Sequence, residues 1–443
     1  MRISIVGTGY VGLVSGACLA DYGHDVTCVD VDPTKLEAIN AGRAPIHEEG
    51  LPEILARTVG RKLKASGDLA RAVHDSEMTL IAVGTPAVQG RIDLAYVARA
   101  AEEIGAALRT KRDYHTVVVK STVIPGTTDG VVRESVEKTS GKRAGADFGL
   151  GMNPEFLTEG TAVVDFMKPD RIVIGGIDER TRKTIATAYE GFPAVPRVFT
   201  NNKTAEMIKY ASNSVLATLI SFSNEIGRLC SAIGDVDVAD VMRGVHEATY
   251  FNVVSQSGER RKASITSFLE AGCGFGGSCL PKDITALAAQ GRSVGVPMPL
   301  LTDVLEINRS QPEELLRLVR KHFSDLKGTH VAVLGLAFKP DTDDLRESPA
   351  FPIIRALRGA GATVIAFDPV ARPVGHPDLA GVQLAQRLED AIASADVIVH
   401  VTRWSEFERL GELLKQAGRN PLVVDGRRNL RPADFARYEG VGR

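Results

Sequence analysis

Short valine- and isoleucine-rich runs alternate with helical patterns over residues 1–200. This alternation is typical of a mainly parallel sheet covered by helices, in which the strands are buried on both faces. The expected strands are Arg2–Val6, Asp25–Val29, Met78–Val83, Thr116–Lys120, Phe148–Met152 and Arg171–Ile174. The first part of the chain is therefore predicted to form a doubly wound α/β domain.

Helical spacing replaces this alternation from Asn201 to Ile233. The apolar residues recur every three or four positions, as on one face of a long helix: Met207, Ile208, Ala211, Val215, Leu219, Phe222, Ile226 and Leu229. More helix is expected through about residue 250 and again from 282 to 322. The charged run Gly258–Lys262 between them is interpreted as an exposed loop.

The strand pattern then restarts, with expected strands at His330–Leu334, Thr363–Phe367, Val397–Val401 and Leu422–Val424. The predicted fold class is α/β, with two Rossmann-like doubly wound parallel-sheet domains joined by a long central helix and a helical middle region. The predicted domains are residues 1–200, 201–324 and 325–443.

The composition limits which binding partners and which cellular compartment are expected. The chain has 443 residues, of which 44% are hydrophobic and 24% charged, and its net charge is -2. Since there is no basic excess, we expect neither nucleic acid nor an anionic membrane as a partner. The first residues run directly into a strand, and no apolar run reaches 18 residues, so neither a signal peptide nor a membrane helix is expected. The 5 cysteines include no CxxC pair, which argues against a metal site and favours a reducing cytoplasm.

A dinucleotide fingerprint, GTGYVG at residues 7–12, joins the first strand to a helix. Gly7 permits the tight turn, Gly9 lets the pyrophosphate approach the backbone, and Gly12 allows close packing of helix and strand. Asp30 ends the second strand, where it would accept a hydrogen bond from a ribose 2′-hydroxyl and repel a 2′-phosphate. NAD is therefore expected as cofactor, with Gly7, Gly9, Tyr10, Val11, Gly12 and Asp30 around it. The alternatives are a simple tight turn for the glycines, and Asp32 as the ribose acceptor.

Polar loops follow three of the predicted strands, at 84–86, 121–128 and 153–160. Ligands of open α/β sheets bind outside the carboxyl ends of the strands, so the three loops predict the rim of an active site. Any one of them alone could be an ordinary turn. Lys209 and Asn213 stand four residues apart on the predicted long helix and share a face. They could stabilise an oxyanion and fix a substrate, or lie on a solvated face.

Cys279 lies in a stretch with four glycines at positions 272–277, and Lys282 and Asp283 follow it directly. Glycines let backbone N–H groups approach a thiol, and a nearby cation favours the reactive thiolate. A nucleophilic cysteine in a dinucleotide-binding chain suggests carbonyl chemistry through a thioester. Cys273 lacks the adjacent Lys-Asp pair, and Cys18, Cys28 and Cys230 are interpreted as buried packing residues.

On the basis of these motifs, the chain resembles the UDP-glucose/GDP-mannose dehydrogenase family. The matching stretches are GTGYVG (7–12), VGTP (83–86), STVIPGTT (121–128), NPEFLTEG (153–160), AEMIKYASN (205–213), GFGGSCLPKD (274–283) and GLAFKPDTDDLRESP (335–349). The resemblance implies a homodimer and a four-electron oxidation of the C6 hydroxymethyl group of a sugar nucleotide to a carboxylate, with two NAD reduced. It also implies an NAD-binding first domain, a central region for dimerisation and catalysis, and a sugar-nucleotide-binding last domain.

The resemblance also implies roles for individual residues. Cys279 would be the nucleophile, Lys209 and Asn213 would stabilise oxyanions at C6, and Asp283 would activate or position water. The implied catalytic set is Cys279, Lys209, Asn213, Asp283, Thr122 and Glu155. Further cofactor contacts would come from Lys35, Thr85, Thr122, Glu159, Lys282 and Arg346. The substrate would contact Glu155, Phe156, Leu157, Thr158, Glu159, Lys209, Asn213, Phe268, Leu269, Glu270, Ala271, Gly272, Gly276 and Lys339.

The chain departs from the family at one position. An arginine about 16 residues before the nucleophile is usual, donated across the dimer, but that spacing falls here on Ala263, with Arg260 and Arg261 nearby. The sugar is also open: the stretch 140–157 leans towards GDP-mannose, whereas 268–272 and 425–430 lean towards UDP-glucose. UDP-glucose is favoured because the latter residues belong to the sugar and nucleotide parts of the implied site.

Two rival functions fit part of this sequence. A two-electron dehydrogenase of the 3-hydroxyacid or 6-phosphogluconate kind would also place a Lys and an Asn one turn apart on a helix, but it needs neither Cys279 nor a second α/β domain. A non-catalytic NAD-binding scaffold has no use for a nucleophile beside Lys282 and Asp283.

Overall fold

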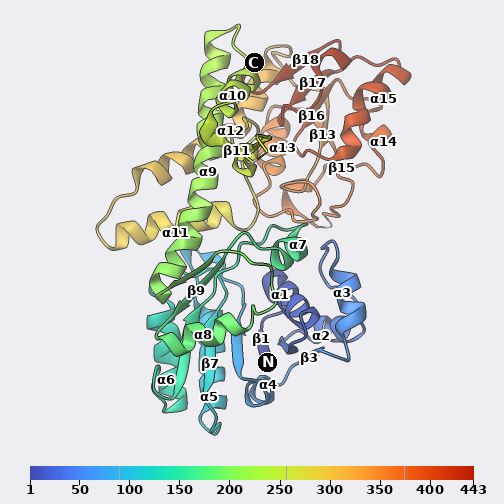
Figure 1. Cartoon of the computed structure of the whole chain (residues 1–443). Helices are drawn as coiled ribbons and strands as arrows, with labels where there is room; N and C mark the ends of the chain where they lie inside the picture. Colours follow the sequence, from blue (N-terminus) through green and yellow to red (C-terminus); the bar gives the residue numbers. More distant parts are fainter. Residues whose placement is uncertain (89, 256, 374) are drawn as a thin grey trace. The chain divides into compact units, whose positions relative to one another are not determined.

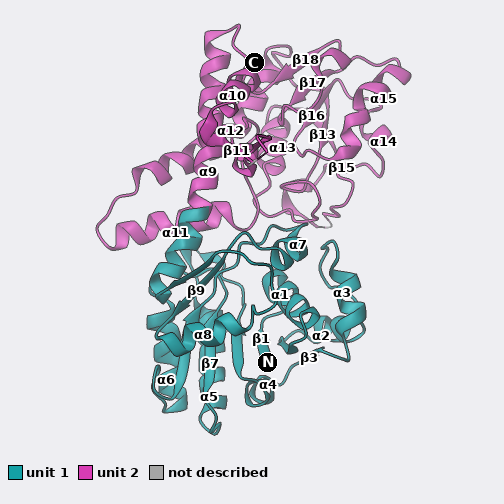
Figure 2. Cartoon of the chain, viewed as in Figure 1, with its two compact units in different colours: residues 1–212 teal, residues 213–443 magenta. Residues whose placement is uncertain are grey.

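The computed structural model describes residues 1–88, 90–255, 257–373 and 375–443. The chain forms two compact units, Met1–Ser212 and Asn213–Arg443, shown in teal and magenta in Figure 2. The boundary falls inside the long helix α9, Asn202–Ile233.

Unit 1 is built on an eight-stranded sheet with the order β10-β9-β8-β7-β4-β1-β2-β3. All neighbours are parallel except β8 and β9, which run antiparallel. Its strands are β1 (Arg2–Val6), β2 (Asp25–Val29), β3 (Leu63–Ser66), β4 (Met78–Ile81), β7 (His115–Val119), β8 (Phe148–Met152), β9 (Ile172–Gly176) and β10 (Arg197–Thr200). A two-stranded ribbon, β5 (Ala87–Val88) and β6 (Arg91–Ile92), stands apart from this sheet.

Helices cover the strands of unit 1 (Figure 1). They are α1 (Tyr10–Asp21), α2 (Pro33–Asn40), α3 (Leu51–Thr58), α4 (Leu69–Asp75), α5 (Ala95–Leu108), α6 (Arg133–Ser140), α7 (Ala162–Met167), α8 (Glu179–Thr187) and the start of α9. Successive residues of one strand enter different apolar clusters: Val118 packs with α1 and α3, whereas Val117 and Val119 pack with α5. Both faces of the sheet are therefore buried, as the continuous apolar strands require.

Unit 2 contains a six-stranded parallel sheet with the order β15-β14-β13-β16-β17-β18. Its strands are β13 (His330–Leu334), β14 (Thr363–Phe367), β15 (Gln383–Leu384), β16 (Val397–His400), β17 (Leu422–Asp425) and β18 (Tyr438–Gly440). Val331 and Val333 enter one apolar cluster and Ala332 and Leu334 another, so this sheet is also buried on both faces.

The helices of unit 2 precede the sheet or connect its strands. They are the rest of α9, α10 (Val238–His246), α11 (Leu280–Ser293), α12 (Pro299–Arg320), α13 (Ala350–Gly359), α14 (Leu388–Ile392) and α15 (Leu410–Gln416). A short antiparallel hairpin, β11 (Asn252–Val254) and β12 (Arg260–Lys262), lies in the helical part.

The predicted fold class is confirmed: each unit holds a mainly parallel sheet, and a helical stretch separates the two. The proposed division into three domains stays a prediction. Two local expectations were wrong. The run Gly258–Lys262 is exposed, but its last three residues pair as β12. The helix expected from 282 to 322 is interrupted after Ser293, where Gly295 has a positive φ of 77°.

Candidate active-site residues in each unit

The glycine loop of unit 1 has the geometry that a dinucleotide needs. Gly7 has φ 99°, and a Cβ there would lie 2.7 Å from the Ala82 carbonyl oxygen. A Cβ on Gly12 would collide with the Gly7 carbonyl oxygen, so both positions require glycine for packing. Gly9 differs, because a Cβ there would have no atom within 4 Å. Its missing side chain leaves open space in front of the first turn of α1, where N–H groups can bind a pyrophosphate.

The Asp30 carboxylate braces this loop. It accepts hydrogen bonds from the Thr8 N–H at 2.7 Å, from the Thr8 hydroxyl at 2.5 Å and from the Asp32 N–H at 3.0 Å. Burial alone would raise the pKa of Asp30, but these hydrogen bonds and the charge of Lys35 outweigh it and hold the pKa below its ordinary value. Asp32 instead accepts from the Thr34 N–H and caps α2, which leaves Asp30 at the cofactor loop.

The two loops after β4 and β7 are bonded to each other. The Thr85 hydroxyl donates to the Thr122 carbonyl at 2.9 Å, and the Ser121 hydroxyl donates to the Val83 carbonyl at 2.7 Å. Glu206, on α9, holds the far end of the second loop by accepting from the N–H groups of Gly126 and Thr128. The structure therefore brings Thr85 and Thr122 together. Glu206 was not predicted, although it lies inside the AEMIKYASN stretch.

The loop after β8 carries a buried ion pair. The Glu155 carboxylate lies 2.9 Å from the Lys209 ammonium, and both side chains are about 95% buried, with exposures of 5% and 4%. Burial alone would raise the pKa of Glu155, but the charge of Lys209 and the hydrogen bond from the Leu157 N–H hold it below its ordinary value. The other predicted loop residues flank this pair: Phe156 lies under the guanidinium of Arg171 at 3.9 Å, and the Thr158 N–H donates to Asp165.

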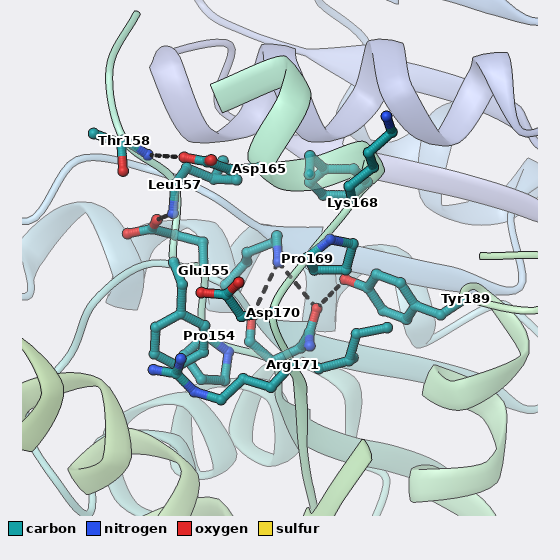
Figure 3. A pocket seen from close by; sticks show the side chains of 15 residues that line it. Pro154, Glu155, Leu157, Thr158, Asp165, Lys168, Pro169, Asp170, Arg171 and Tyr189 are labelled. Carbon is teal, nitrogen blue, oxygen red and sulfur yellow. Dashed lines mark hydrogen bonds between the residues drawn. The ribbon is translucent and has the colours of Figure 1, made fainter. Parts of the chain in front are cut away.

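A second ammonium lies close by. Lys120 donates to the side-chain oxygen of Asn153 at 3.0 Å and to its carbonyl at 3.3 Å, and the Tyr189 hydroxyl donates to the same side-chain oxygen. Burial lowers the pKa of Lys120 to about 8. Lys120, Asn153 and Tyr189 line a cavity of about 140 Å³ together with Glu155 and Arg171, and Figure 3 shows the last two beside Tyr189. Sequence reasoning missed Lys120, although it directly precedes the STVIPGTT motif.

The cofactor loop and the loop after β8 share a partner that was also missed. The Tyr10 hydroxyl donates to the Glu48 carboxylate, and the Gly160 N–H lies 2.7 Å from both of these groups. Glu48 is 3% exposed. This contact fixes the end of the 153–160 loop, where Glu159 is half-buried, against the start of α1.

In unit 2, Cys279 stands directly before α11, and its thiol lies 3.6 Å from the Ser278 hydroxyl. The structure describes all five cysteines, and Cys279 alone is exposed. Burial raises the pKa of Cys18 and Cys28 to about 12. Cys273 is buried, which raises its pKa, and its thiol donates to the Val401 carbonyl. The thiols expected to be packing residues are thus buried, and Cys279 is accessible.

Asp283 lies one helical turn after Cys279, and its N–H donates to the Cys279 carbonyl at 2.9 Å. Its carboxylate is 1% exposed and accepts from the Asn213 amide at 2.7 Å and from the Lys282 ammonium at 2.6 Å. The structure therefore joins Lys282 and Asp283, from one predicted motif, to Asn213, from another.

The predicted substrate residues of unit 2 surround a cavity of about 430 Å³. Its lining includes Phe268, Glu270, Ala271, Gly272, Gly276 and Lys339, together with Arg427 from the stretch 425–430 and the unpredicted Arg403. Leu269 is buried beneath this stretch instead. The Gly272 N–H donates to Asn224, and the Gly272 carbonyl accepts from Gln311, so the stretch is fixed from both sides.

The glycine-rich loop is also fixed to the stretch that follows β13. The Gly277 N–H donates to the Arg346 carbonyl at 2.9 Å, while the exposed Arg346 side chain pairs with Asp344 at 2.7 Å. Among the described residues, no group of three or more His, Cys, Asp or Glu side chains could hold a metal ion. None of the helices in the described ranges has the length and apolarity to span a membrane.

Comparisons with known proteins agree with this arrangement. Profiles of the UDP-glucose/GDP-mannose dehydrogenase family match three ranges: the NAD-binding domain at 1–193, the central domain at 203–310 and the UDP-binding domain at 332–432. A UDP-glucose 6-dehydrogenase of Haloferax volcanii is 42% identical over 100% of both chains. A GDP-mannose 6-dehydrogenase of Pseudomonas putida is 38% identical, also over 100% of both.

A solved structure gives the same result. A UDP-glucose dehydrogenase from Pyrobaculum islandicum superposes with a TM-score of 0.89 at 38% identity, covering 99% of this chain and 97% of that one. The open space at Gly9 and the helix start behind it fit the cofactor that the NAD-binding profile implies.

Proposed function

The chain belongs to the UDP-glucose/GDP-mannose dehydrogenase family, whose members are NAD-dependent oxidoreductases acting on sugar nucleotides, and within it we propose that this protein oxidises UDP-glucose to UDP-glucuronate. The observation that carries the chemistry is the exposed Cys279 thiol one helical turn from a buried carboxylate, Asp283, which Asn213 and Lys282 hold. A two-electron dehydrogenase has no use for such a thiol.

The proposed reaction has two oxidations and one hydrolysis. When bound at the glycine loop of unit 1, NAD would supply the hydride acceptor for each oxidation. The C6 alcohol first loses a hydride and its hydroxyl proton to give an aldehyde. The Cys279 thiolate then adds to the aldehyde carbon, and the resulting thiohemiacetal loses a second hydride to give a thioester. Water cleaves the C–S bond, the thiolate leaves, and the product is a carboxylate.

The residues around this chemistry have distinct proposed roles. Lys209 supplies positive charge to the oxygen on C6 as negative charge develops, and Asn213 donates a hydrogen bond to the same oxygen. The carboxylate of Glu155 lies 2.9 Å from the Lys209 ammonium and compensates its positive charge in this buried position. Asp283 activates or positions the hydrolytic water, with Thr122 and Glu155 beside it.

The binding residues are proposed on the same basis. NAD contacts the glycine loop, with Asp30, Lys35, Thr85, Thr122, Glu159, Lys282 and Arg346 as further contacts. The sugar nucleotide contacts the loop 155–159 and the cavity residues of unit 2. Asp30 favours NAD over NADP because it would face the 2′-phosphate of NADP.

We favour UDP-glucose over GDP-mannose as the substrate because residues 268–272 and 425–430 resemble the UDP-glucose branch of the family. The Haloferax volcanii and Pyrobaculum islandicum proteins, both named for UDP-glucose, support this choice. GDP-mannose and UDP-N-acetylhexosamines are the competing substrates.

We also propose a homodimer in a reducing cytoplasm. The part of α9 that belongs to unit 2 carries large apolar side chains that the single chain leaves exposed: Val215, Phe222, Leu229 and Ile233, with exposures of 47% to 64%. Their spacing of seven or four residues puts them on one stripe of the helix, which a second copy would bury. The structure describes all five cysteines and joins none of them in a disulfide.

An NADH assay against a panel of UDP- and GDP-sugars tests the function. We expect two NADH and one acid per UDP-glucose, without free aldehyde, and poor activity with NADP. One NADH per substrate with a neutral product would refute the four-electron reaction. Preferential turnover of GDP-mannose or of a UDP-N-acetylhexosamine would instead refute only the assignment of the sugar nucleotide.

A further inference from the structure

Three cations follow neighbouring strands of the unit 2 sheet. β13, β16 and β17 are adjacent, as Figure 1 shows, and Lys339, Arg403 and Arg427 come after their carboxyl ends. All three side chains line the 430 Å³ cavity. Because parallel strands direct their carboxyl ends to one edge of a sheet, the three cations gather at the edge where ligands of such sheets bind.

The charge of the cavity fits a diphosphate. Among the charged residues that line it, Lys339, Arg403 and Arg427 are positive and Glu270 alone is negative, so the lining carries a net charge of about +2. The diphosphate of a sugar nucleotide carries two negative charges. The only carboxylate, Glu270, is already paired with a cation: its oxygen lies 2.7 Å from the Arg403 guanidinium.

We propose that Arg403 binds the diphosphate of the sugar nucleotide, and that Glu270 holds its guanidinium in place before the ligand arrives. This inference rests on the proposed function, because it takes the cavity as the sugar-nucleotide site. It assigns a binding role to Arg403, which lies outside every motif that the sequence singled out.

The hydrogen bonds of Arg403 leave donors for such a ligand. Both bonds given by its guanidinium within the described part of the chain start at Nη2, one to Glu270 and one to the Arg427 carbonyl at 2.9 Å. The Nε and Nη1 donors remain for phosphate oxygens, and the planar fork of arginine suits them. Arg427 is committed differently, since its Nε and Nη1 donate to the carbonyls of Val401 and Gly274.

The ion pair contributes little to folding, which favours a role in binding. The side chains of Arg403 and Glu270 are 43% and 44% exposed. Ion pairs that are this exposed stabilise a fold by about 0–1 kcal/mol. A guanidinium whose position is fixed in advance loses less side-chain entropy when it binds a phosphate, so the pair prepares Arg403 for its ligand.

The test measures binding of UDP, GDP, UMP and uridine to the full-length protein by calorimetry, without turnover. In Arg403→Gln we expect the dissociation constants of UDP and GDP to rise by the same factor, about 10- to 100-fold, as for a lost hydrogen bond to a charged group. Uridine, which has no phosphate, should change less than about threefold. The matched control is Arg409→Gln, because Arg409 is an exposed arginine of the same unit that pairs with Glu389 at 3.2 Å. Its UDP affinity should equal that of the wild type.

The Glu270→Gln variant tests whether Arg403 binds the diphosphate directly or acts only through its ion pair with Glu270. If Arg403 binds the diphosphate itself, this variant should lose less than about threefold in UDP affinity, because the guanidinium remains. An equal loss in Glu270→Gln and Arg403→Gln would overturn the proposal, since Arg403 would then act only through Glu270. Unchanged UDP affinity in Arg403→Gln would overturn it as well. Failure of the proposed function is distinguishable: the wild type would then favour GDP or bind neither nucleotide, whereas the contact with the diphosphate is independent of the base.

Discussion

The same turn opens both sheets of this protein, and the two units use it differently. After β1, Gly7 has φ 99° and donates its N–H to Val29 of the neighbouring strand at 2.8 Å. After β13, Gly335 has φ 95° and donates to Phe367 at 2.8 Å. The two glycines therefore have nearly the same φ, and each donates an equally long hydrogen bond to the end of the neighbouring strand.

The carboxylates that end the second strands also correspond. Asp30 accepts from the Thr8 N–H, and Asp368 accepts from the Leu336 N–H, each at 2.7 Å. Asp368 is surrounded by donors, since it also accepts from Ala337, Val370, Ala371 and the Trp404 indole. It is a structural brace with little capacity left for a ribose, whereas Asp30 accepts from just two of the described residues, Thr8 and Asp32.

The residue two positions after each turn glycine determines what the turn can bind. In unit 1 it is Gly9, with open space around it and α1 starting at once. In unit 2 it is the buried Ala337, and α13 begins only at Ala350. The difference shows that a dinucleotide needs more than the turn: it needs the second glycine and a helix start directly behind it. Unit 2 has replaced these with a long loop that carries Lys339 and Arg346.

The largest expected effect tests whether unit 2 supplies the nucleophile. Cys279→Ser should lower steady-state turnover on the order of 10³-fold or more, because a serine hydroxyl without a base is a weak nucleophile and its ester hydrolyses slowly. NADH production with UDP-glucose measures this, and the alkylation rate of Cys279 should fall when substrate is bound.

Cys273→Ser is the matched control for this experiment. Cys273 is buried in the same stretch, so its substitution should cost about 1 kcal/mol of stability and less than about tenfold in rate. If Cys273 proves to be the essential, substrate-protected thiol, the assignment of the nucleophile is wrong.

The next effect separates the charged groups of the two units. Lys209→Ala should slow the oxidations by about 10²–10³-fold, because the oxygen on C6 loses its cation. Asp283→Asn should slow hydrolysis of the thioester instead. Rapid-quench kinetics should then show a burst of NADH and an adduct on Cys279 in Asp283→Asn, and neither in Lys209→Ala.

A contrary result for Asp283 has a defined meaning. Normal turnover in Asp283→Asn, or a stalled enzyme without an adduct, would make Asp283 a structural residue. It would then serve only to join Asn213 of α9 to Lys282 in the first turn of α11.

A smaller effect is expected when the glycine turn after β1 is made to resemble the turn after β13. Gly9→Ala puts the methyl group of Ala337 into the cofactor loop, and we expect the KM for NAD to rise by about 10- to 100-fold. Folding should be unaffected, since no atom lies within 4 Å of the new Cβ. Gly7→Ala should do the reverse and destabilise the fold by about 1–3 kcal/mol, because φ 99° is strained for alanine. Thermal melting and NAD titration measure the two outcomes, and equal NAD affinity in Gly9→Ala would contradict the proposed role of Gly9.

The sequence predicted the central strands of both sheets and missed the edges. Within the two large sheets, the four strands without a prediction are β10, β3, β15 and β18, which are the outermost strands. Central strands are buried on both faces and appear as apolar runs, but edge strands are partly exposed, as are both residues of β15, Gln383–Leu384. The sequence pattern also could not predict that β9 runs antiparallel to β8, because the spacing of apolar residues does not encode strand direction.

The residues of the candidate site also divide into those that the sequence could predict and those that it could not. Residues within contiguous motifs, such as Cys279 and Asp283, could be identified because their neighbours in sequence are their neighbours in space. Glu48 and Arg403 could not, since their partners are 112 and 133 residues away. Reading the strand ends of the second sheet as closely as those of the first would have drawn attention to Arg403.

A pH-dependent effect on stability is expected at Lys120, and its sign follows from linkage. Burial lowers its pKa from 10.5 to about 8 in the folded protein. Between these values the unfolded chain binds a proton that the folded chain has lost, so the stability of the wild type gains about 3 kcal/mol as pH rises from about 8 to about 10.5. Lys120→Met lacks this gain, and the difference in urea midpoint between variant and wild type should shift in favour of the wild type across that window. The exposed Lys183, paired with Glu179 on α8, provides the control, because Lys183→Met should keep the slope of the wild type. Identical slopes in Lys120→Met and the wild type would mean that Lys120 stays charged in the fold, held by Glu155 and Asn153.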